Sequence, residues 1–383
     1  MIVFVNGKLI ARPILASQVY LDRPDIVFYA SSRRKLLSIK LMINHEQKAI
    51  SYDAWLFWTV ANRCNLNCTY CNASNPKRMI KKFYDLGSLN SVKMIKVNLG
   101  KLLEQSFQKG LFPVYRETKA KLTPNARTVI DIPALIRTLD AAQKIFKISF
   151  TGGEPFFVPN FIDACKAITQ KHYITLFSNL TSPDIKTFGE TMDPRNVLEI
   201  CGSLHIKELE RCRLLERYIE NFILLKKKGF NVSAQAVAYP DLADDVENYR
   251  LYFQERGIDI AFVPLRGRYR WKQYPKSYTE QEIKRFGFGP FPKSHTDIMN
   301  SFYRKGKMCN AGYNVGVVFP SGEAQSCFLL SQSLGNVFTK IEFNKKLIQC
   351  PFPYCSCPLN TYDPYLFKRA VSENNEHDSA LTC

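Results

Sequence analysis

The sequence predicts an α/β fold: a partial (β/α)6 TIM-type barrel with a small β-rich extension before it and a cysteine-rich domain after it. Three observations predict this. Six apolar runs of strand length follow residue 54, segments of helical periodicity separate them, and the first fifty residues hold only short alternating runs. Because right-handed crossovers curl a parallel sheet, we expect the active site at the carboxyl ends of its strands.

The order of these patterns divides the chain into four parts. We expect a β-rich extension over residues 1–53, the barrel over 54–265, a basic linker over 266–308 and a cysteine-bearing domain over 309–383. The stretch between the first two barrel strands is too long for one crossover, so residues 75–127 are interpreted as a basic insertion, a lid or an arm beside the site.

Each element follows from its local pattern. The extension begins with a strand at Ile2–Val5, an Asn6-Gly7 turn and a later strand at Ile26–Tyr29. The six barrel strands are expected at Trp55–Val60, Phe146–Phe150, Tyr173–Phe177, Val197–Ile206, Asn231–Val237 and Ile258–Pro264. Helices are expected at Val92–Phe107, Ala134–Lys144 and Glu208–Gly229, and a strand-turn-strand unit at Val315–Phe319, Ser321-Gly322 and Ala324–Cys327.

Composition narrows the class of protein. Of the 383 residues 46% are hydrophobic and 13% aromatic, which favours a globular chain over a disordered one. No apolar run approaches the roughly 18 residues of a membrane helix, and Met1–Lys8 lacks the features of a signal peptide. We therefore expect a cytoplasmic protein with no membrane span.

The net charge of +19 is unevenly spread. Asn75–Ala126 and Arg266–Met308 each hold 11 Lys or Arg against 3 Asp or Glu. Such a field favours an anionic partner: nucleic acid, a phosphorylated or carboxylated small molecule, an acidic peptide or an anionic membrane surface. A solvated basic face without function is the alternative.

Twelve cysteines in a reducing compartment are metal ligands or buried thiols rather than disulfides. Cys64, Cys68 and Cys71 form a C-x3-C-x2-C run directly after a predicted strand. Three thiolates are one short of the four that close an ordinary iron–sulfur or zinc site, so one metal would stay open to an outside ligand. A structural zinc site would need a fourth ligand nearby, but the next cysteine is Cys165.

This run, with the aromatic Tyr70 before its last cysteine, resembles the signature of the radical S-adenosylmethionine (radical SAM) superfamily. Thr151–Pro155, directly after a predicted strand, looks like that family's Gly-Gly-Glu-Pro turn, which meets the methionine amino group of the cofactor. The resemblance implies a 4Fe–4S cluster on Cys64, Cys68 and Cys71 as the catalytic centre, which cleaves S-adenosylmethionine to a 5'-deoxyadenosyl radical.

The resemblance also implies a shell of residues around S-adenosylmethionine. Its members are Tyr70, Gly152, Gly153, Glu154, Pro155, Ser178, Asn179, Ser203 and His205. The two glycines would let backbone approach the ligand closely. Plain structural roles remain open for Tyr70, as a packing residue, and for Ser203 and His205, at a strand end.

A second resemblance lies near the carboxyl terminus. Cys309-x12-Gly322-x4-Cys327 is similar to the opening of the SPASM and Twitch extensions of the superfamily, and its implication is an auxiliary 4Fe–4S cluster. The sequence is more similar to the truncated Twitch type, because the full SPASM pattern contains seven cysteines. A zinc knuckle or oxidised pairs are the alternatives.

Five thiols stand in this region where one cluster takes at most four protein ligands. Cys350, Cys355 and Cys357 follow the first two cysteines, so the ligand set stays open: two of these three, or the terminal Cys383, would complete it. Cys165, Cys201 and Cys212 are interpreted as packing residues.

Neither set of motifs identifies the substrate. Our first interpretation is a radical enzyme that acts on a peptide or a small polar, anionic molecule, with an electron donor such as ferredoxin or flavodoxin. The Arg266–Arg270 segment would suit a phosphate or carboxylate, or is a solvated linker. The Arg268–Lys272 run, with its interleaved aromatics, would suit an RNA substrate, and a non-catalytic zinc protein that binds nucleic acid is the third interpretation.

Overall fold

The computed structural model describes strand backbones at residues 2–5, 8–10, 27–32 and 35–37, and full residues at 51–71, 129–288, 294–330, 332–355 and 365–372. The Asn6-Gly7 turn, the basic insertion with its expected helix at Val92–Phe107, Cys357 and Cys383 lie outside the described residues. The amino-terminal strands are β1 (Ile2–Val5), β2 (Lys8–Ile10), β3 (Val27–Ser32) and β4 (Lys35–Leu37). They pair antiparallel in the order β2-β1-β3-β4, as the alternating pattern predicts.

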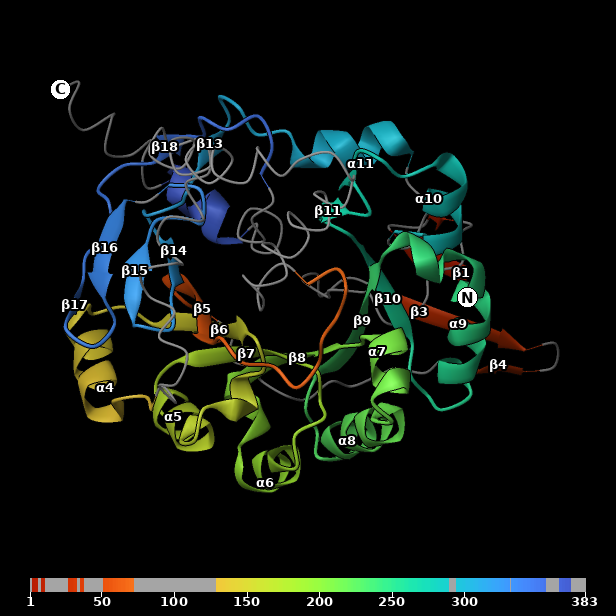
Figure 1. Ribbon diagram of the computed structural model, residues 1–383, viewed down its shortest axis with the longest axis horizontal. Coiled ribbons are helices and arrows are strands. Elements are labelled where there is room, and N and C mark those ends of the chain that lie inside the picture. The colour runs from red at the N-terminus through yellow and green to blue at the C-terminus, as the bar shows by residue number, and fades with distance from the viewer. Residues whose placement is uncertain are drawn as a thin grey trace, which may run out of the picture.

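Six parallel strands form the centre of the fold, and the predicted α/β class is confirmed. They are β5 (Ala54–Ala61), β6 (Phe146–Gly152), β7 (Tyr173–Ser178), β8 (Val197–Ser203), β9 (Val232–Ala238) and β10 (Ile260–Pro264). Each pairs with the next in chain order. The sheet is a curved, open crescent rather than a closed barrel (Figure 1).

The crescent does not end at β5. The sheet continues through β14 (Val315–Val318), β15 (Glu323–Gln325), β16 (Ser333–Asn336) and β17 (Lys340–Ile341). β14 lies parallel to β5 with Val317 opposite Phe57, and the other three strands are antiparallel. The cysteine-bearing part of the chain is therefore joined to the barrel through backbone hydrogen bonds.

Helices cover the convex face of the sheet (Figure 1). They are α4 (Ile132–Ala141), α5 (Phe161–Ile168), α6 (Asp184–Thr191), α7 (Ile206–Arg211), α8 (Leu215–Lys227) and α9 (Val246–Gln254). Short 3-10 turns lie at η3 (Pro155–Phe157), η4 (Pro194–Asn196) and η5 (Pro240–Asp245). Apolar side chains from strands and helices, such as Trp58, Phe150 and Phe161, are buried between the two layers.

Several predicted boundaries differ from the structure, and two of the differences lie close to the site. The helix expected at Glu208–Gly229 is two helices, because Arg213 adopts a left-handed φ of 56° that a continuous helix cannot contain. The strand expected at Val197–Ile206 ends at Ser203, and His205 already caps α7. The chain therefore turns at the carboxyl end of β8, where the site lies.

The rest of the described chain forms smaller elements. The hairpin of β11 (Gly267–Tyr269) and β12 (Lys272–Tyr274) precedes α10 (Glu280–Phe286) and α11 (His295–Phe302). β13 (Met308–Cys309) pairs with β18 (Ile348–Gln349), and residues 365–372 are helical. Among the described residues, no helix has the length and apolar character that crossing a membrane requires.

Candidate functional site

The three cysteines of the first motif lie in one loop at the carboxyl end of β5, which we call the cysteine loop (residues 62–71). Burial raises the pKa of Cys64 to about 11 and that of Cys68 still further, and the nearby thiol of Cys71 adds to both shifts. Thiolates this close repel one another and are poorly hydrated. The loop therefore suits a cationic metal centre that compensates their charge.

The Gly-Gly-Glu turn after β6 is fastened to the start of this loop. Gly153 N–H donates to the carbonyl of Ala61 and Glu154 N–H to that of Arg63, both at 2.7 Å. A Cβ at Gly152, where φ is +122°, would lie 2.3 Å from the Ala61 oxygen, and one at Gly153 would lie 2.0 Å from the Arg63 oxygen. The glycines thus permit close approach to the cysteine loop, whereas the sequence suggested approach to the ligand.

Glu154 is a buried carboxylate with a side chain 1% exposed. It accepts hydrogen bonds from the Ser178 hydroxyl at 2.8 Å, Asn179 N–H at 2.8 Å and Phe156 N–H at 3.4 Å. Burial nevertheless raises its pKa to about 7. It forms no ion pair with any described side chain, so among the described residues only these three hydrogen-bond donors stabilise its negative charge. Pro155, also buried, begins η3 and fixes the turn after it.

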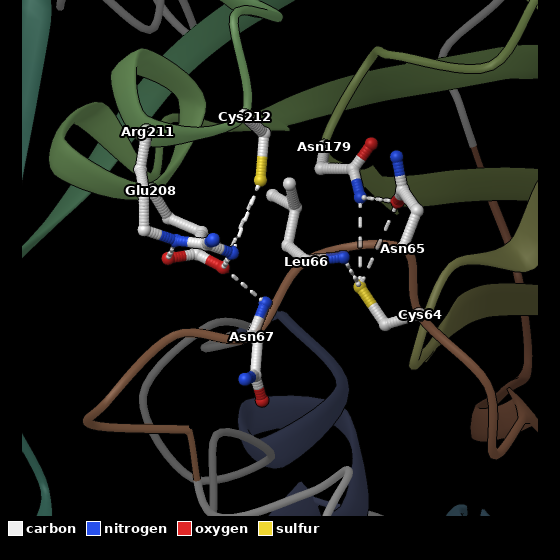
Figure 2. A network of polar contacts seen from close by, with 8 residues as sticks. All are labelled: Cys64, Asn65, Leu66, Asn67, Asn179, Glu208, Arg211 and Cys212. Atoms are coloured by element: carbon white, nitrogen blue, oxygen red, sulfur yellow. Dashed lines mark hydrogen bonds and ion pairs between the residues drawn. The ribbon is translucent and has the colours of Figure 1, made fainter.

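Asn179 connects this turn to the cysteine loop (Figure 2). Its side-chain amide donates to Cys64 Sγ at 3.6 Å and to Asn65 Oδ1 at 2.8 Å. Its own Oδ1 accepts from the Thr181 hydroxyl at 2.6 Å, and Asn65 donates to that hydroxyl at 2.8 Å. The amide of Leu66 adds a second donor to Cys64 Sγ, at 3.4 Å. Two amide donors thus face the same sulfur, which stabilises its ionised form.

Glu208 of α7 holds the other side of the loop (Figure 2). Its Oε1 accepts from Asn67 N–H at 2.5 Å, and Arg211 binds both carboxylate oxygens at 2.7 and 2.9 Å. Arg211 also donates to Cys212 Sγ at 3.2 Å. The sequence motifs missed Glu208 because a Glu in the first turn of a helix is common, and only the fold brings it to the loop.

Two more of the predicted residues meet beside the loop. Tyr70 and His205 share a hydrogen bond of 2.8 Å between the phenol oxygen and Nδ1, and Tyr239 packs on Tyr70 with ring centroids 4.5 Å apart. Burial lowers the pKa of His205 to about 4, so its ring is neutral at neutral pH. Ser203 lies half-buried at the end of β8, on the same edge. These residues thus place aromatic and polar groups together beside the cysteines.

The hairpin after β10 reaches the same region. Tyr269 packs against Tyr239 with centroids 5.8 Å apart and donates to Asp241 at 2.6 Å. Asp241 also pairs with Arg270 at 2.6 Å. Arg266, by contrast, lies 4.6 Å over the ring of Phe302. The Arg266–Arg270 segment is therefore only partly available for a phosphate or carboxylate.

Four cysteines of the second motif line one small cavity: Cys309, Cys327, Cys350 and Cys355. Burial raises the pKa of Cys309 to about 11, with further increases from the other three thiols. The remaining cavity walls are Asn310, Ala311, Leu329, Leu330, Ile348 and Phe352.

The chain around Cys327 turns its amide groups toward the sulfur. Leu329 N–H and Leu330 N–H donate to Cys327 Sγ at 3.3 and 3.1 Å. Among the described residues, no three Cys, His, Asp or Glu side chains converge as ligands of a single metal ion. The four thiols instead surround a space, an arrangement suited to a group larger than one ion.

The chain matches the Radical SAM superfamily over residues 58–251. No curated protein matches it. Similar solved structures include anSMEcpe with bound AdoMet, at 16% identity over 74% of each chain with a TM-score of 0.46. SuiB of Streptococcus suis bound to the precursor peptide SuiA is similar at 15% identity over 83% of this chain and 66% of that one, with a TM-score of 0.44.

Proposed function

Since this chain belongs to the radical SAM superfamily, we propose that it is an enzyme that holds a 4Fe–4S cluster on Cys64, Cys68 and Cys71 and reductively cleaves S-adenosylmethionine there. The observation that supports the proposal is the direct hydrogen bonding between the cysteine loop and the turn that contains Glu154. When bound, the cluster and its cofactor supply a 5'-deoxyadenosyl radical that abstracts hydrogen from a peptide or a small polar, anionic substrate.

Glu154 is proposed to receive the methionine ammonium group. Its carboxylate is fully buried and has no cationic partner among the described side chains, although an isolated buried charge is costly. A ligand ammonium would supply the missing charge, and Ser178 and Asn179 N–H would keep the carboxylate in place.

The neighbouring side chains are proposed to position the rest of the cofactor. Tyr70 would lie against adenine, with its hydroxyl held by the neutral His205. Ser203, half-buried at the same strand end, would complete the polar part of the pocket. The apolar layer behind these groups limits access of water to a primary radical.

The second cysteine set is proposed to hold an auxiliary 4Fe–4S cluster. The proposed ligands are Cys309, Cys327, Cys350 and Cys355, because these four line one cavity and two amide groups already face Cys327. The proposed role is to bind substrate or to accept an electron from the product radical. A ferredoxin or flavodoxin is the proposed electron donor to the first cluster.

Iron and sulfide content after anaerobic reconstitution, with a chromatographic assay for 5'-deoxyadenosine, tests both sites. We expect about eight irons per chain and cofactor cleavage with dithionite. Replacing Cys64, Cys68 and Cys71 by Ala should remove about four irons and all cleavage, whereas Cys165→Ala, in α5 and outside both sets, should change neither. Full cleavage by the triple variant would refute the first site.

RNA is the second candidate substrate, and one observation favours it. Trp271 is 63% exposed at the tip of the β11–β12 hairpin, beside the exposed Arg268 and Lys272. An exposed aromatic ring among cations suits base stacking with phosphate contacts. If RNA is the substrate, its affinity should fall as the salt concentration rises, with a slope that corresponds to several phosphate contacts. Trp271→Ala should lower the affinity for RNA but leave uncoupled cofactor cleavage unchanged.

A further inference from the structure

An exposed aromatic and basic surface covers the second cysteine site. We call it the 303–308 surface: it comprises Tyr303, Arg304, Lys305, Lys307 and Met308, with Tyr354 beside them. Tyr303 and Met308 are each 42% exposed and Tyr354 is 53% exposed. Large hydrophobic side chains are rarely exposed in the described part of the chain, and three of the exposed ones lie in this surface.

Backbone hydrogen bonds connect this surface directly to the cysteines. Gly306 N–H donates to the carbonyl of Cys350 at 2.8 Å, and Cys350 N–H donates to that of Lys307 at 2.9 Å. Met308 precedes Cys309 in β13, which pairs with β18 just before Cys350. The surface is therefore one residue or one hydrogen bond from the thiols that line the cavity.

The other edge of the surface is connected in the same way. Tyr303 and Tyr354 form an isolated bridge and pack edge to face, with centroids 5.8 Å apart. Tyr354 precedes Cys355, whose N–H donates to the carbonyl of Phe302 at 2.9 Å. An electron at the cavity would therefore have a short path through bonded groups to the exposed face.

The positive charges of this surface have no opposite partner among the described residues. Arg304, Lys305 and Lys307 form no ion pair with any described residue, and the segments 303–308 and 348–355 contain no Asp or Glu. Tyr, Met and Arg are enriched at protein interfaces, and the positive charge of this surface favours an acidic partner.

We propose that the 303–308 surface docks an acidic one-electron carrier protein of the iron–sulfur or flavin type. This inference rests on the proposed auxiliary cluster and names its partner. One electron leaves the reduced cluster, which is thereby oxidised by one unit, and reduces the oxidised carrier by one unit; no bond or proton is exchanged.

The ring geometry favours a protein over RNA at this surface. The planes of Tyr303 and Tyr354 lie at 82° to each other, so the pair offers no continuous platform on which successive bases would stack. RNA is nevertheless anionic and is kept as an outcome of the test.

The test measures electron transfer from the reduced, reconstituted enzyme to an oxidised acidic plant-type ferredoxin. Freeze-quench EPR follows the auxiliary cluster, whose signal is identified by its loss in a Cys309→Ala, Cys327→Ala variant. One variant carries Gln at Arg304, Lys305 and Lys307. The control carries Gln at Arg217, Lys227 and Lys228, three exposed cations of α8 and its C-cap. This helix lies far from β13 and β18 in Figure 1.

At low ionic strength we expect electron transfer to be about tenfold slower in the surface variant than in wild type, and within about twofold of wild type in the control. Both variants lose three positive charges, but only the surface variant loses the patch that attracts the carrier. The difference should vanish at about 0.5 M salt. The single change Lys305→Gln, expected to slow transfer about twofold, gives the same test if the triple variant binds iron poorly.

Equal rates in the two triple variants, with eight irons retained, would overturn the docking surface and leave the auxiliary cluster intact. About four irons per wild-type chain would instead refute the auxiliary cluster and this inference with it. Loss of binding to a short RNA in the surface variant, without a change in electron transfer, would assign the surface to RNA and overturn the proposal.

Discussion

Glu154→Gln is the sharpest test of the proposed cofactor pocket, because it removes one charge and keeps the shape of the side chain. Gln has one acceptor oxygen, which can keep the hydrogen bonds from Ser178 and Phe156 that Oε1 now accepts, whereas the Asn179 N–H, bound to Oε2, then faces the Gln amide group. Depriving a buried ligand ammonium of its carboxylate partner costs about 3 kcal/mol, which corresponds to a dissociation constant for S-adenosylmethionine about 150-fold higher.

The pH dependence of binding provides a second readout. Burial raises the pKa of Glu154 to about 7, and only the ionised carboxylate attracts an ammonium group. Above about pH 8 the amino group of the ligand itself loses its proton, in wild type and variant alike. Below pH 7 the wild-type affinity should fall about tenfold per pH unit. The Gln variant should show no such slope. Equilibrium binding to the reconstituted protein under anaerobic conditions measures both.

The stability of the cofactor-free protein is the control for a folding defect. Its dependence on pH has the opposite sign to that of cofactor binding. A pKa raised from 4.5 to about 7 means that protonation of Glu154 stabilises the cofactor-free fold, a contribution present below pH 4.5 and lost as the pH rises through 7. The lost contribution is about 3 kcal/mol, which offsets the cost of about 1–3 kcal/mol for an Asn179 N–H without its acceptor, so Glu154→Gln should be about as stable as wild type at pH 8. A variant that folds well but binds the cofactor within about twofold of wild type, with the same pH slope, would refute the reasoning.

Three further changes test the supports of the two cysteine sites. Gly153→Ala should yield protein with less than half of its iron by colorimetric assay, because the new Cβ would lie 2.0 Å from a carbonyl oxygen of the cysteine loop; full iron content would argue against this contact. Glu208→Ala, which leaves a loop N–H without its acceptor, should speed iron loss to a chelator about tenfold, whereas Glu210→Ala on the same helix should not. Cys355→Ala should remove about four irons and Cys357→Ala none; the reverse result would exchange their roles.

The sequence predicted the parallel sheet well because buried strands are continuous apolar runs. Phe146–Phe150 lies within β6, and Tyr173–Phe177 within β7. The ends of elements were harder to predict. The interruption at Arg213, which lies with a left-handed backbone between α7 and α8, has no Gly or Pro to mark it in the sequence.

The site divides in the same way. Local motifs led to the prediction of Cys64 and Glu154 as site residues, because a tight spacing and a glycine turn are visible along the chain. The side chains that hold them come from elsewhere: Thr181 lies 116 residues from Asn65, and Glu208 lies 141 residues from Asn67. No pattern over a few residues reports such contacts, since each exists only once the carboxyl ends of neighbouring strands have met.

The position of β14 explains how the two cysteine sites are related. It extends the sheet beside β5, and the side chains of Trp55 and Phe57 pack with Val315 and Val317 in a small separate core. β5 leads into the cysteine loop, while β14 and β15 lead toward Cys327. Because adjacent strands in one sheet are held at fixed spacing, the distance between the sites is set by the sheet rather than by a flexible linker. Such a fixed separation would suit the proposed electron exchange between a substrate radical and the proposed auxiliary cluster, because a rigid sheet keeps the two sites at one distance.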